Sequence, residues 1–224
     1  MAPRAIALIV DIMEQPNLFD DSMRALVRIA AAVAGPSLAV TRRVMADSVN
    51  VASSDEVDEV LLQSYLFAGF PRALNAARAW REISGTPAPD TDAEAVAASE
   101  WEDRGALACR TVYGNKYDAL RDAVGRLHPA LDAWMVSDGY GKVLSRPGLS
   151  LVQRELCIVA ACAASEQMPQ LKSHLRGSLS CGATIEDLAL TLSALGDIVS
   201  REALAAAREE LNRIKESRQC SSIK

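Results

Sequence analysis

The amino-acid sequence predicts an all-α protein, and three observations carry this prediction. Half of the residues are hydrophobic but only 4% are aromatic, so the core must be built from Ala, Leu and Val, and Ala and Leu favour helices most strongly. Glycine and proline are sparse and clustered, so they separate the apolar segments instead of interrupting them. No segment shows a convincing alternation of polar and apolar residues, so we predict no strands.

Length and charge limit the partners that this chain can have. Its 224 residues are enough for one or two domains with a sizeable apolar core. The net charge of −5 and the pI near 5.2 argue against a nucleic-acid partner, which favours a basic surface. The longest uncharged apolar run, residues 156–164, is much shorter than the roughly 20 residues that span a bilayer. We therefore expect no nucleic acid and no membrane among the partners.

The cysteines and the N-terminal segment indicate the compartment. Residues 1–15 make a poor secretory signal, because Asp11 interrupts their apolar run. The five cysteines are odd in number and include no C-x-x-C pair, so neither a disulfide framework nor a zinc site is predicted. These features favour reduced thiols in a cytoplasmic protein, and we expect no metal and no cofactor.

In the first part of the chain, each predicted helix follows a capping residue or a break. The first begins at Asp20 and Asp21 and stops at Gly35-Pro36, and Ser53 or Ser54 caps the third. Residues 85–92, GTPAPDTD, are rich in turn formers and read as a linker. The four predicted helices span residues 20–34, 37–47, 56–68 and 72–83.

The second part of the chain contains a helix that must be buried. Residues 156–165 carry no charge, so a helix there has no face suited to water. Ser150 caps this helix, Pro129 starts an earlier one, and residues 140–148 are predicted to form a loop. The other predicted helices span residues 93–107, 117–127, 168–180, 185–195 and 202–215, and a frayed tail covers 220–224.

The two parts of the chain resemble each other. Residues 53–57, SSDEV, are echoed by residues 183–188, ATIEDL, and residues 73–78, ALNAAR, by residues 203–208, ALAAAR. An offset of about 130 residues is too long for a solenoid repeat and indicates a duplicated helical unit. We predict two tandem half-domains, residues 1–92 and residues 93–224.

Several short motifs, in order, are similar to those of one family. They are RPGL at 146–149, REL at 154–156, QLKSHLRG at 170–177 and GAT at 182–184, with LLQ at 61–63 and FAGFP at 67–71 in the first half. This series resembles the carboxymuconolactone decarboxylase family, whose superfamily includes the alkylhydroperoxidase D-like proteins, over roughly residues 22–83 and 113–212. The resemblance implies an alkylhydroperoxidase D-like helical fold that packs into rings. For a duplicated chain it implies a homo-oligomer, either a trimer of pseudo-dimers or a hexamer.

The sequence departs from the peroxidase members of that superfamily at two positions. Their pattern contains a glutamate, a C-x-x-C pair and a histidine. When it is laid on Glu155 and His174, the two cysteine positions fall on Gln167 and Gln170. Because peroxide reduction by that mechanism needs a thiolate and a resolving thiol, the sequence disfavours it.

Glu155 and His174 are the predicted catalytic residues. His174 shares an apolar helix face with Leu171, Leu175 and Leu179, and it is either a core histidine with one hydrogen bond or a general acid–base. Glu155 is either an early-helix carboxylate paired to an arginine such as Arg154, or the group that orients the imidazole. The functional hypothesis requires the two side chains to meet. In the first half Arg43 or a neighbour falls where His174 stands, and no acid clearly matches Glu155, so one site per chain is predicted.

Five further residues are predicted to bind a substrate. Arg146 and Arg176 have the guanidinium fork that holds a carboxylate, although an ion-paired or solvated surface arginine is the simpler reading of Arg176. Gln167, Gln170 and Tyr140 can add neutral hydrogen bonds.

The leading functional hypothesis is a carboxymuconolactone decarboxylase-like enzyme that acts on a small carboxylated lactone or carbonyl compound. His174 would move a proton to or from carbon, and Glu155 would orient the imidazole. One alternative is a non-catalytic oligomeric protein that binds a small ligand. Another is a peroxidase that uses a single cysteine such as Cys181.

Overall fold

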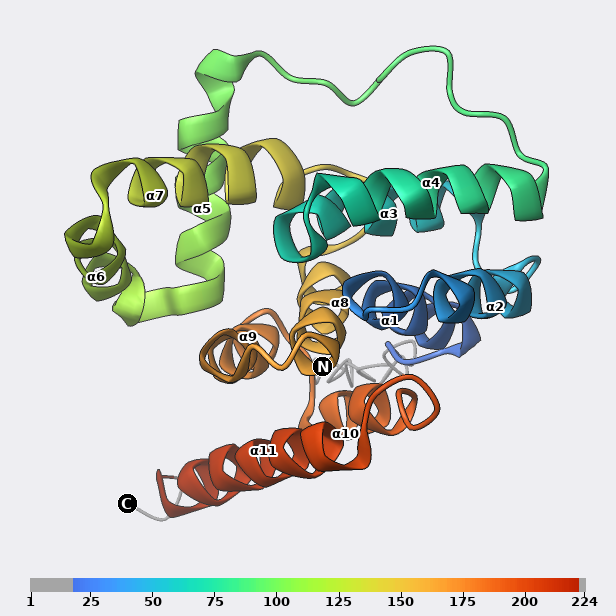
Figure 1. The fold of residues 1–224 in the computed structure, drawn as a ribbon. Coiled ribbons are helices and arrows are strands. Elements are labelled where there is room, and N and C mark those ends of the chain that lie inside the picture. The colour runs from blue at the N-terminus through green and yellow to red at the C-terminus, as the bar shows by residue number, and fades with distance from the viewer. Residues whose placement is uncertain (1–17, 222–224) are drawn as a thin grey trace, which may run out of the picture.

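The computed structural model describes residues 18–221, and every regular element within them is a helix. The all-α prediction is therefore confirmed. At the centre lies α8 (Leu151–Ala164), which packs against α1 (Asp21–Ala34), α9 (Met168–Ser180) and α10 (Ile185–Ser193) (Figure 1). Every residue of α8 from position 154 to position 163 is buried, as its lack of charged residues after position 155 predicts.

The first part of the described chain contains α1, α2 (Leu38–Ser48), α3 (Ser54–Ala68) and α4 (Phe70–Ser84). Local chemistry starts these helices where the sequence indicates. The Asp20 carboxylate accepts a hydrogen bond from the Met23 amide, and Ser53 and Glu56 form a reciprocal capping box. Gly69, with φ of 80°, ends α3 in a backbone conformation that disfavours other residues.

The middle of the chain differs from the prediction in two places. Residues 93–97 were predicted to be helical but continue the linker, because they offer no apolar stripe to bury and are mostly exposed. Residues 140–144, predicted as a loop, belong to the π-helix η3 (Met135–Leu144). The other helices of this part are η1 (Ala98–Glu100), α5 (Trp101–Tyr113), η2 (Gly114–Lys116), α6 (Tyr117–Leu127) and α7 (Pro129–Trp134).

Two glycines explain why η3 packs so closely on α5. A Cβ added at Gly105 of α5 would overlap the Val136 carbonyl oxygen, and one added at Gly141 of η3 would overlap the Trp101 carbonyl oxygen. The backbones therefore touch in both directions. Because these contacts join residues about 30 and 40 positions apart in the chain, short-range sequence patterns do not reveal them.

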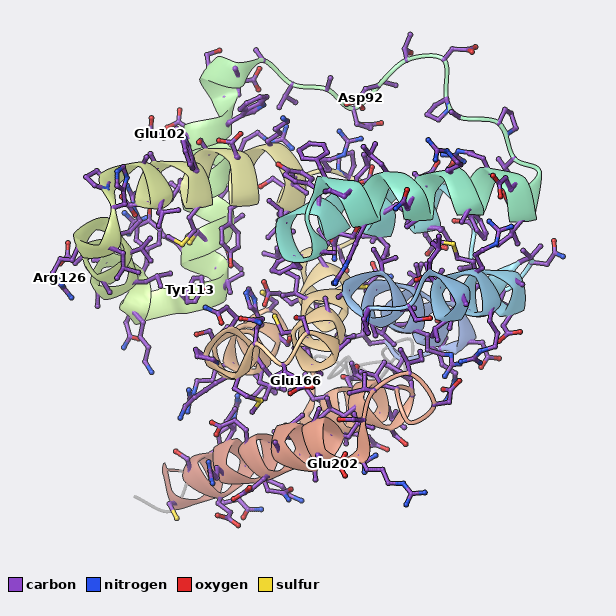
Figure 2. The ribbon with its side chains drawn as sticks, in the orientation of Figure 1. Asp92, Glu102, Tyr113, Arg126, Glu166 and Glu202 are labelled. Carbon is purple, nitrogen blue, oxygen red and sulfur yellow. The ribbon has the colours of Figure 1, made fainter. Side chains whose placement is uncertain are left out.

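The linker between α4 and η1 arches over one side of the molecule (Figure 1). Asp92, labelled in Figure 2, lies partway along the linker, and its carboxylate forms two 3.0 Å hydrogen bonds with the Arg146 guanidinium. This ion pair fastens the linker to the segment that precedes α8.

The four helices α1–α4 and the four helices α8–α11 pack in the same pattern. Each later helix begins 130 or 131 residues after its counterpart, with α11 spanning Arg201–Ser221. In both sets the first helix contacts the other three, the second contacts the fourth, and the third contacts the fourth. Even a detail repeats: the Ser48 hydroxyl donates to the Val44 carbonyl, and the Ser178 hydroxyl donates to the His174 carbonyl.

Two sequence expectations concern the chain ends and the membrane. The signal-peptide reading of residues 1–15 lies outside the described residues. Of the predicted frayed tail, residues 220 and 221 belong to α11, and the rest lies outside the described residues. Among residues 18–221, none of the helices combines the length and the apolar character needed to cross a bilayer.

Candidate functional site

The site is built on the contact between α8 and α9. Glu155 comes from the first part of α8, and His174 comes from the middle of α9. The His174 Nδ1 lies 2.8 Å from Oε2 of Glu155. The carboxylate has no exposure to solvent and the histidine is 7% exposed. The predicted meeting of these two side chains is confirmed.

Gly177 makes room for this contact. A Cβ at position 177 would lie 2.7 Å from Oε2 of Glu155 and 2.6 Å from Cγ1 of Val112, which belongs to α5. These separations are too short for any side chain. Only glycine therefore allows α9 to approach both the carboxylate and α5 at this point.

The buried carboxylate has an unusual set of partners. Its Oε1 has no hydrogen-bond partner, and across residues 18–221 its only ion pair is with His174. An uncompensated charge in an apolar interior is costly. The contact with His174 Nδ1 is the compensation that residues 18–221 supply to this carboxylate.

The second ring nitrogen, Nε2, is the reactive atom of such a pair. No hydrogen bond to Nε2 is formed by any residue from 18 to 221, and 9% of the His174 side chain remains exposed. The Phe67 ring packs edge-on against the imidazole, with 6.0 Å between the ring centroids. Because the carboxyl group of Glu155 holds Nδ1, Nε2 is the ring nitrogen left to contact a substrate.

Several weak acids near Glu155 are kept protonated by burial, with a smaller contribution from the charge of Glu155. Burial raises the pKa of each of four thiols to about 12, and the Glu155 charge adds to this effect at three of them, Cys109, Cys162 and Cys181. The fourth thiol is that of Cys157. Burial also raises the pKa of Tyr113 and Tyr140, again with a contribution from Glu155. Thiolates are therefore disfavoured near neutral pH, which argues against cysteine-based peroxidase chemistry.

Arg154 does not pair with Glu155, so the reading that paired these neighbours is wrong. Adjacent helix residues point about 100° apart, and the fully buried Arg154 guanidinium faces α3 instead. It donates to Oε2 of Glu59 at 2.7 Å and to the carbonyls of Arg146 and Pro147 at 2.9 and 3.0 Å.

The predicted substrate-binding residues are scattered. The Arg146 guanidinium forms ion pairs with Glu59 and Asp92, and its predicted role as a substrate clamp stays a prediction. The Gln167 amide donates to the Ser165 carbonyl, and Gln170 is exposed on α9. Tyr140 is buried, with its hydroxyl 3.3 Å from that of Tyr113. Arg176 is exposed, and its Nη2 lies 3.9 Å from Oε1 of Glu210.

Several important residues were not singled out by the sequence analysis. Gly177 and Phe67 belong to the motifs QLKSHLRG and FAGFP, so the sequence did point to these two residues. Tyr113 and Glu59 carried no signal, because each depends on contacts between distant segments. In the described part of the chain, no three His, Cys, Asp or Glu side chains gather in a metal-binding arrangement.

Comparisons with known proteins fit this architecture. Residues 129–212 match the model of the carboxymuconolactone decarboxylase family, a range that contains both Glu155 and His174. The chain is also 32% identical over 132 residues to Peroxisomal protein 2 of Schizosaccharomyces pombe (strain 972 / ATCC 24843), which covers 58% of this chain and 62% of that relative. The chain thus spans less than two thirds of the relative's length. The sequence resemblance to the carboxymuconolactone decarboxylase family is therefore confirmed over residues 129–212, which hold the Glu155–His174 pair.

Proposed function

We propose that this protein is a carboxymuconolactone decarboxylase-like enzyme that performs acid–base chemistry at carbon on a small carboxylated lactone or carbonyl compound. The observation that carries the proposal is the buried His174–Glu155 pair, in which Nδ1 is bonded and Nε2 has no hydrogen-bond partner among residues 18–221. A core histidine that serves only packing does not need a fully buried carboxylate whose other oxygen is left unbonded.

The pair suits proton transfer in either direction. As a base, Nε2 takes a proton from a carbon next to a carbonyl, the electron pair moves into that carbonyl, and Glu155 stabilises the imidazolium. In a decarboxylation the bond to the carboxylate breaks, carbon dioxide leaves, and the resulting enolate takes a proton at carbon from protonated Nε2. Such positioned proton transfer typically contributes about 10²–10⁴-fold in rate.

The test uses conservative variants and a panel of γ-lactones and keto acids. Proton NMR in deuterium oxide measures exchange at the carbon next to the carbonyl, and the same spectra report loss of substrate. We expect His174→Gln to lower the rate on any active compound by about 10²-fold or more, and Glu155→Gln to lower it less. Arg126→Gln, a change on the exposed outer edge of α6 (Figure 2), should have no effect. A His174→Gln protein with the wild-type rate would refute the proposal.

A non-catalytic ligand-binding protein is the second candidate, and one observation favours it. A cavity of about 400 Å³ lies beside α9. Gly177 and Ser173 line it, but His174 does not. If the protein only binds, ligands from the panel will bind saturably without turnover, and His174→Gln will leave their affinity unchanged. Peroxide-dependent sulfenylation of one thiol would instead support the peroxidase alternative.

We also propose that the chain is a tandem duplication with one site. The equivalent helices support this, and the positions 130 residues before Glu155 and His174 hold the buried apolar residues Ala25 and Val44. Ala25 and Val44 contribute to packing and cannot transfer a proton. The first half therefore serves as a scaffold.

Self-association and compartment complete the proposal. Phe70, Leu74 and Trp134 are exposed, and such apolar surface favours a homo-oligomer, a trimer of pseudo-dimers or a hexamer. Light scattering coupled to size exclusion tests this against the 24.0 kDa of one chain. We propose a cytoplasmic location. The printed name of the relative makes the peroxisome the alternative, and imaging of a fluorescent fusion distinguishes the two.

A further inference from the structure

The cavity of about 400 Å³ lies where three elements meet. It is bounded by the C-terminal end of α5 with η2, by one face of α9, and by the C-terminal part of α11, which Figure 1 shows on the same side of the molecule. Tyr113, labelled in Figure 2, lies at the end of α5 and contributes to its wall. A cavity of this size suits a small organic molecule.

The lining of the cavity is positively charged. Lys116 comes from η2 and Arg176 from α9, and Arg218 of α11, which has an interaction of its own, also lines the cavity. Among residues 18–221, no acidic residue joins them in the lining. Serine hydroxyls from α9 and α11, those of Ser173, Ser180 and Ser217, add neutral hydrogen-bonding groups. Cations from three separate elements converge here although the chain as a whole is acidic.

Glu210 is the acid that Arg176 contacts, and this contact leaves donors of the Arg176 guanidinium available. Glu210 of α11 is buried, and its carboxylate lies 3.3 Å from Lys172, 3.3 Å from Arg213 and 3.9 Å from Arg176. One carboxylate is therefore shared among three cations. Arg176 makes the longest of these contacts and remains 44% exposed, so its guanidinium keeps donors for a further anion.

The cavity and the His174–Glu155 pair share a wall. Gly177 lines the cavity, and its missing Cβ is what lets Oε2 of Glu155 lie directly behind it. Val112 lines the cavity and touches the same point, and Tyr113 links the cavity wall to the buried Tyr140. A ligand held against Gly177 lies next to the proton-transfer pair, with only this thin wall between them.

We propose that this cavity binds the anionic group of a small organic ligand, a carboxylate or a phosphate, through Lys116 and Arg176. The two cations hold the acid group at the mouth of the cavity, and the remainder of the ligand lies along Gly177 and Tyr113. Because His174 does not line the cavity, this binding does not depend on the acid–base function proposed above.

Titration calorimetry on the full chain tests the proposal directly. The probes are inorganic phosphate, 2-oxoglutarate, and the uncharged dimethyl ester of 2-oxoglutarate. We expect at least one anion to bind, its affinity to fall as salt rises, and the ester not to bind. Arg176→Gln and Lys116→Gln should each raise Kd about tenfold, as expected for one lost charge-assisted contact. Arg126→Gln, a matched loss of one positive charge far from the cavity, should leave Kd unchanged.

Each outcome assigns or overturns the site. Binding of phosphate alone assigns a phosphorylated ligand, and binding of 2-oxoglutarate assigns a carboxylate. Binding of neither anion, equal binding of the ester, or wild-type affinity in both cavity variants overturns the inference. His174→Gln should keep anion affinity, because His174 does not line the cavity. If His174→Gln loses turnover while Arg176→Gln binds anions like the wild type, the cavity assignment is wrong and the proposed function stands. If Arg176→Gln loses anion affinity while His174→Gln keeps the wild-type turnover, the proposed function is wrong and the cavity assignment stands.

Discussion

His174 Nδ1 and Oε2 of Glu155 are 2.8 Å apart in the interior between α8 and α9. Within the described chain neither side chain has another hydrogen-bonding side-chain partner. This isolation makes the two residues interdependent, in stability as well as in chemistry. The pair is also separate from the buried Arg154–Glu59 ion pair. Arg154 directly precedes Glu155 on α8, but its side chain faces α3.

The isolated pair predicts strong thermodynamic coupling. His174→Leu leaves a buried carboxyl group without its partner, and we expect it to lower the free energy of unfolding by about 3–5 kcal/mol. The double variant Glu155→Leu/His174→Leu removes both polar groups and should recover about 2 kcal/mol or more of that loss. Urea unfolding of the four proteins in the cycle measures the coupling. A double variant whose loss equals the sum of the single losses would show that the residues act independently.

Gly177→Ala should be destabilising because its new methyl group has no space. It would meet Oε2 of Glu155 and Cγ1 of Val112 at contact-violating distances, and such overpacking costs about 1–3 kcal/mol. Gly125→Ala in α6 is the matched control, since the nearest atom to its Cβ is 3.9 Å away. That change should stabilise the protein by about 0.5–1 kcal/mol through helix propensity. Thermal unfolding compares the two, and a neutral Gly177→Ala protein would contradict the close approach of α9 to Glu155.

Arg154→Met should be among the most damaging single changes in the molecule. It leaves Glu59 and two carbonyls without a fully buried donor, and breaking one side of a buried pair costs about 3–5 kcal/mol. Arg24 stands 130 positions earlier, and its ion pair with Asp21 is long and exposed. Arg24→Met should therefore change stability by no more than about 0.5 kcal/mol. Equal losses in the two variants, measured by denaturant unfolding, would contradict this difference between the halves.

Asp197 provides a pH-dependent link between the halves. The hydrogen bond from Arg28 lowers the pKa of the Asp197 carboxyl well below its ordinary value of 3.8, so its stabilisation is complete above that value and is lost as pH falls toward the folded-state pKa. The carboxylate is 46% exposed, so Asp197→Asn should cost no more than about 1 kcal/mol at pH 7.

Below pH 4 the stability of the two proteins should begin to converge, because Asp197 of the unfolded chain takes up a proton there and the folded carboxylate does so at still lower pH. Unfolding curves at pH 7, 5 and 3 follow this convergence. A difference that stays constant across the range would show that the charge of Asp197 plays no part.

The thiols should react in a pattern set by burial. Cys220 is exposed, whereas Cys109, Cys157, Cys162 and Cys181 are buried or partly buried and have pKa values raised to about 12. Ellman's reagent at pH 7.5 should therefore modify one thiol quickly and the others slowly. Denaturant should release all five, which serves as the control. Rapid modification of a second thiol in the native protein would revive a cysteine-based mechanism.

Local sequence determined the helices of this protein and the burial of α8. Caps such as Ser53 with Glu56, the break at Gly69, and the uncharged run after Glu155 act within a few residues. The position of His174 on an apolar face could be read in the same way. These features need no knowledge of the rest of the chain, because their energies come from adjacent turns of one helix.

Tertiary structure alone decided which partner each charged group meets. The Arg154 guanidinium pairs with Glu59 and not with Glu155. The Arg146 guanidinium pairs with Glu59 and with Asp92 of the linker. The π-helix η3 formed where Gly105 and Gly141 let two distant backbones touch, and Lys116, Arg176 and Arg218 converged from three elements. An ion pair or a close contact acts over a few ångströms in space and is indifferent to separation along the chain. The sequence by itself therefore identifies the candidate residues of the site. The packing of the helices determines which of these residues contact one another.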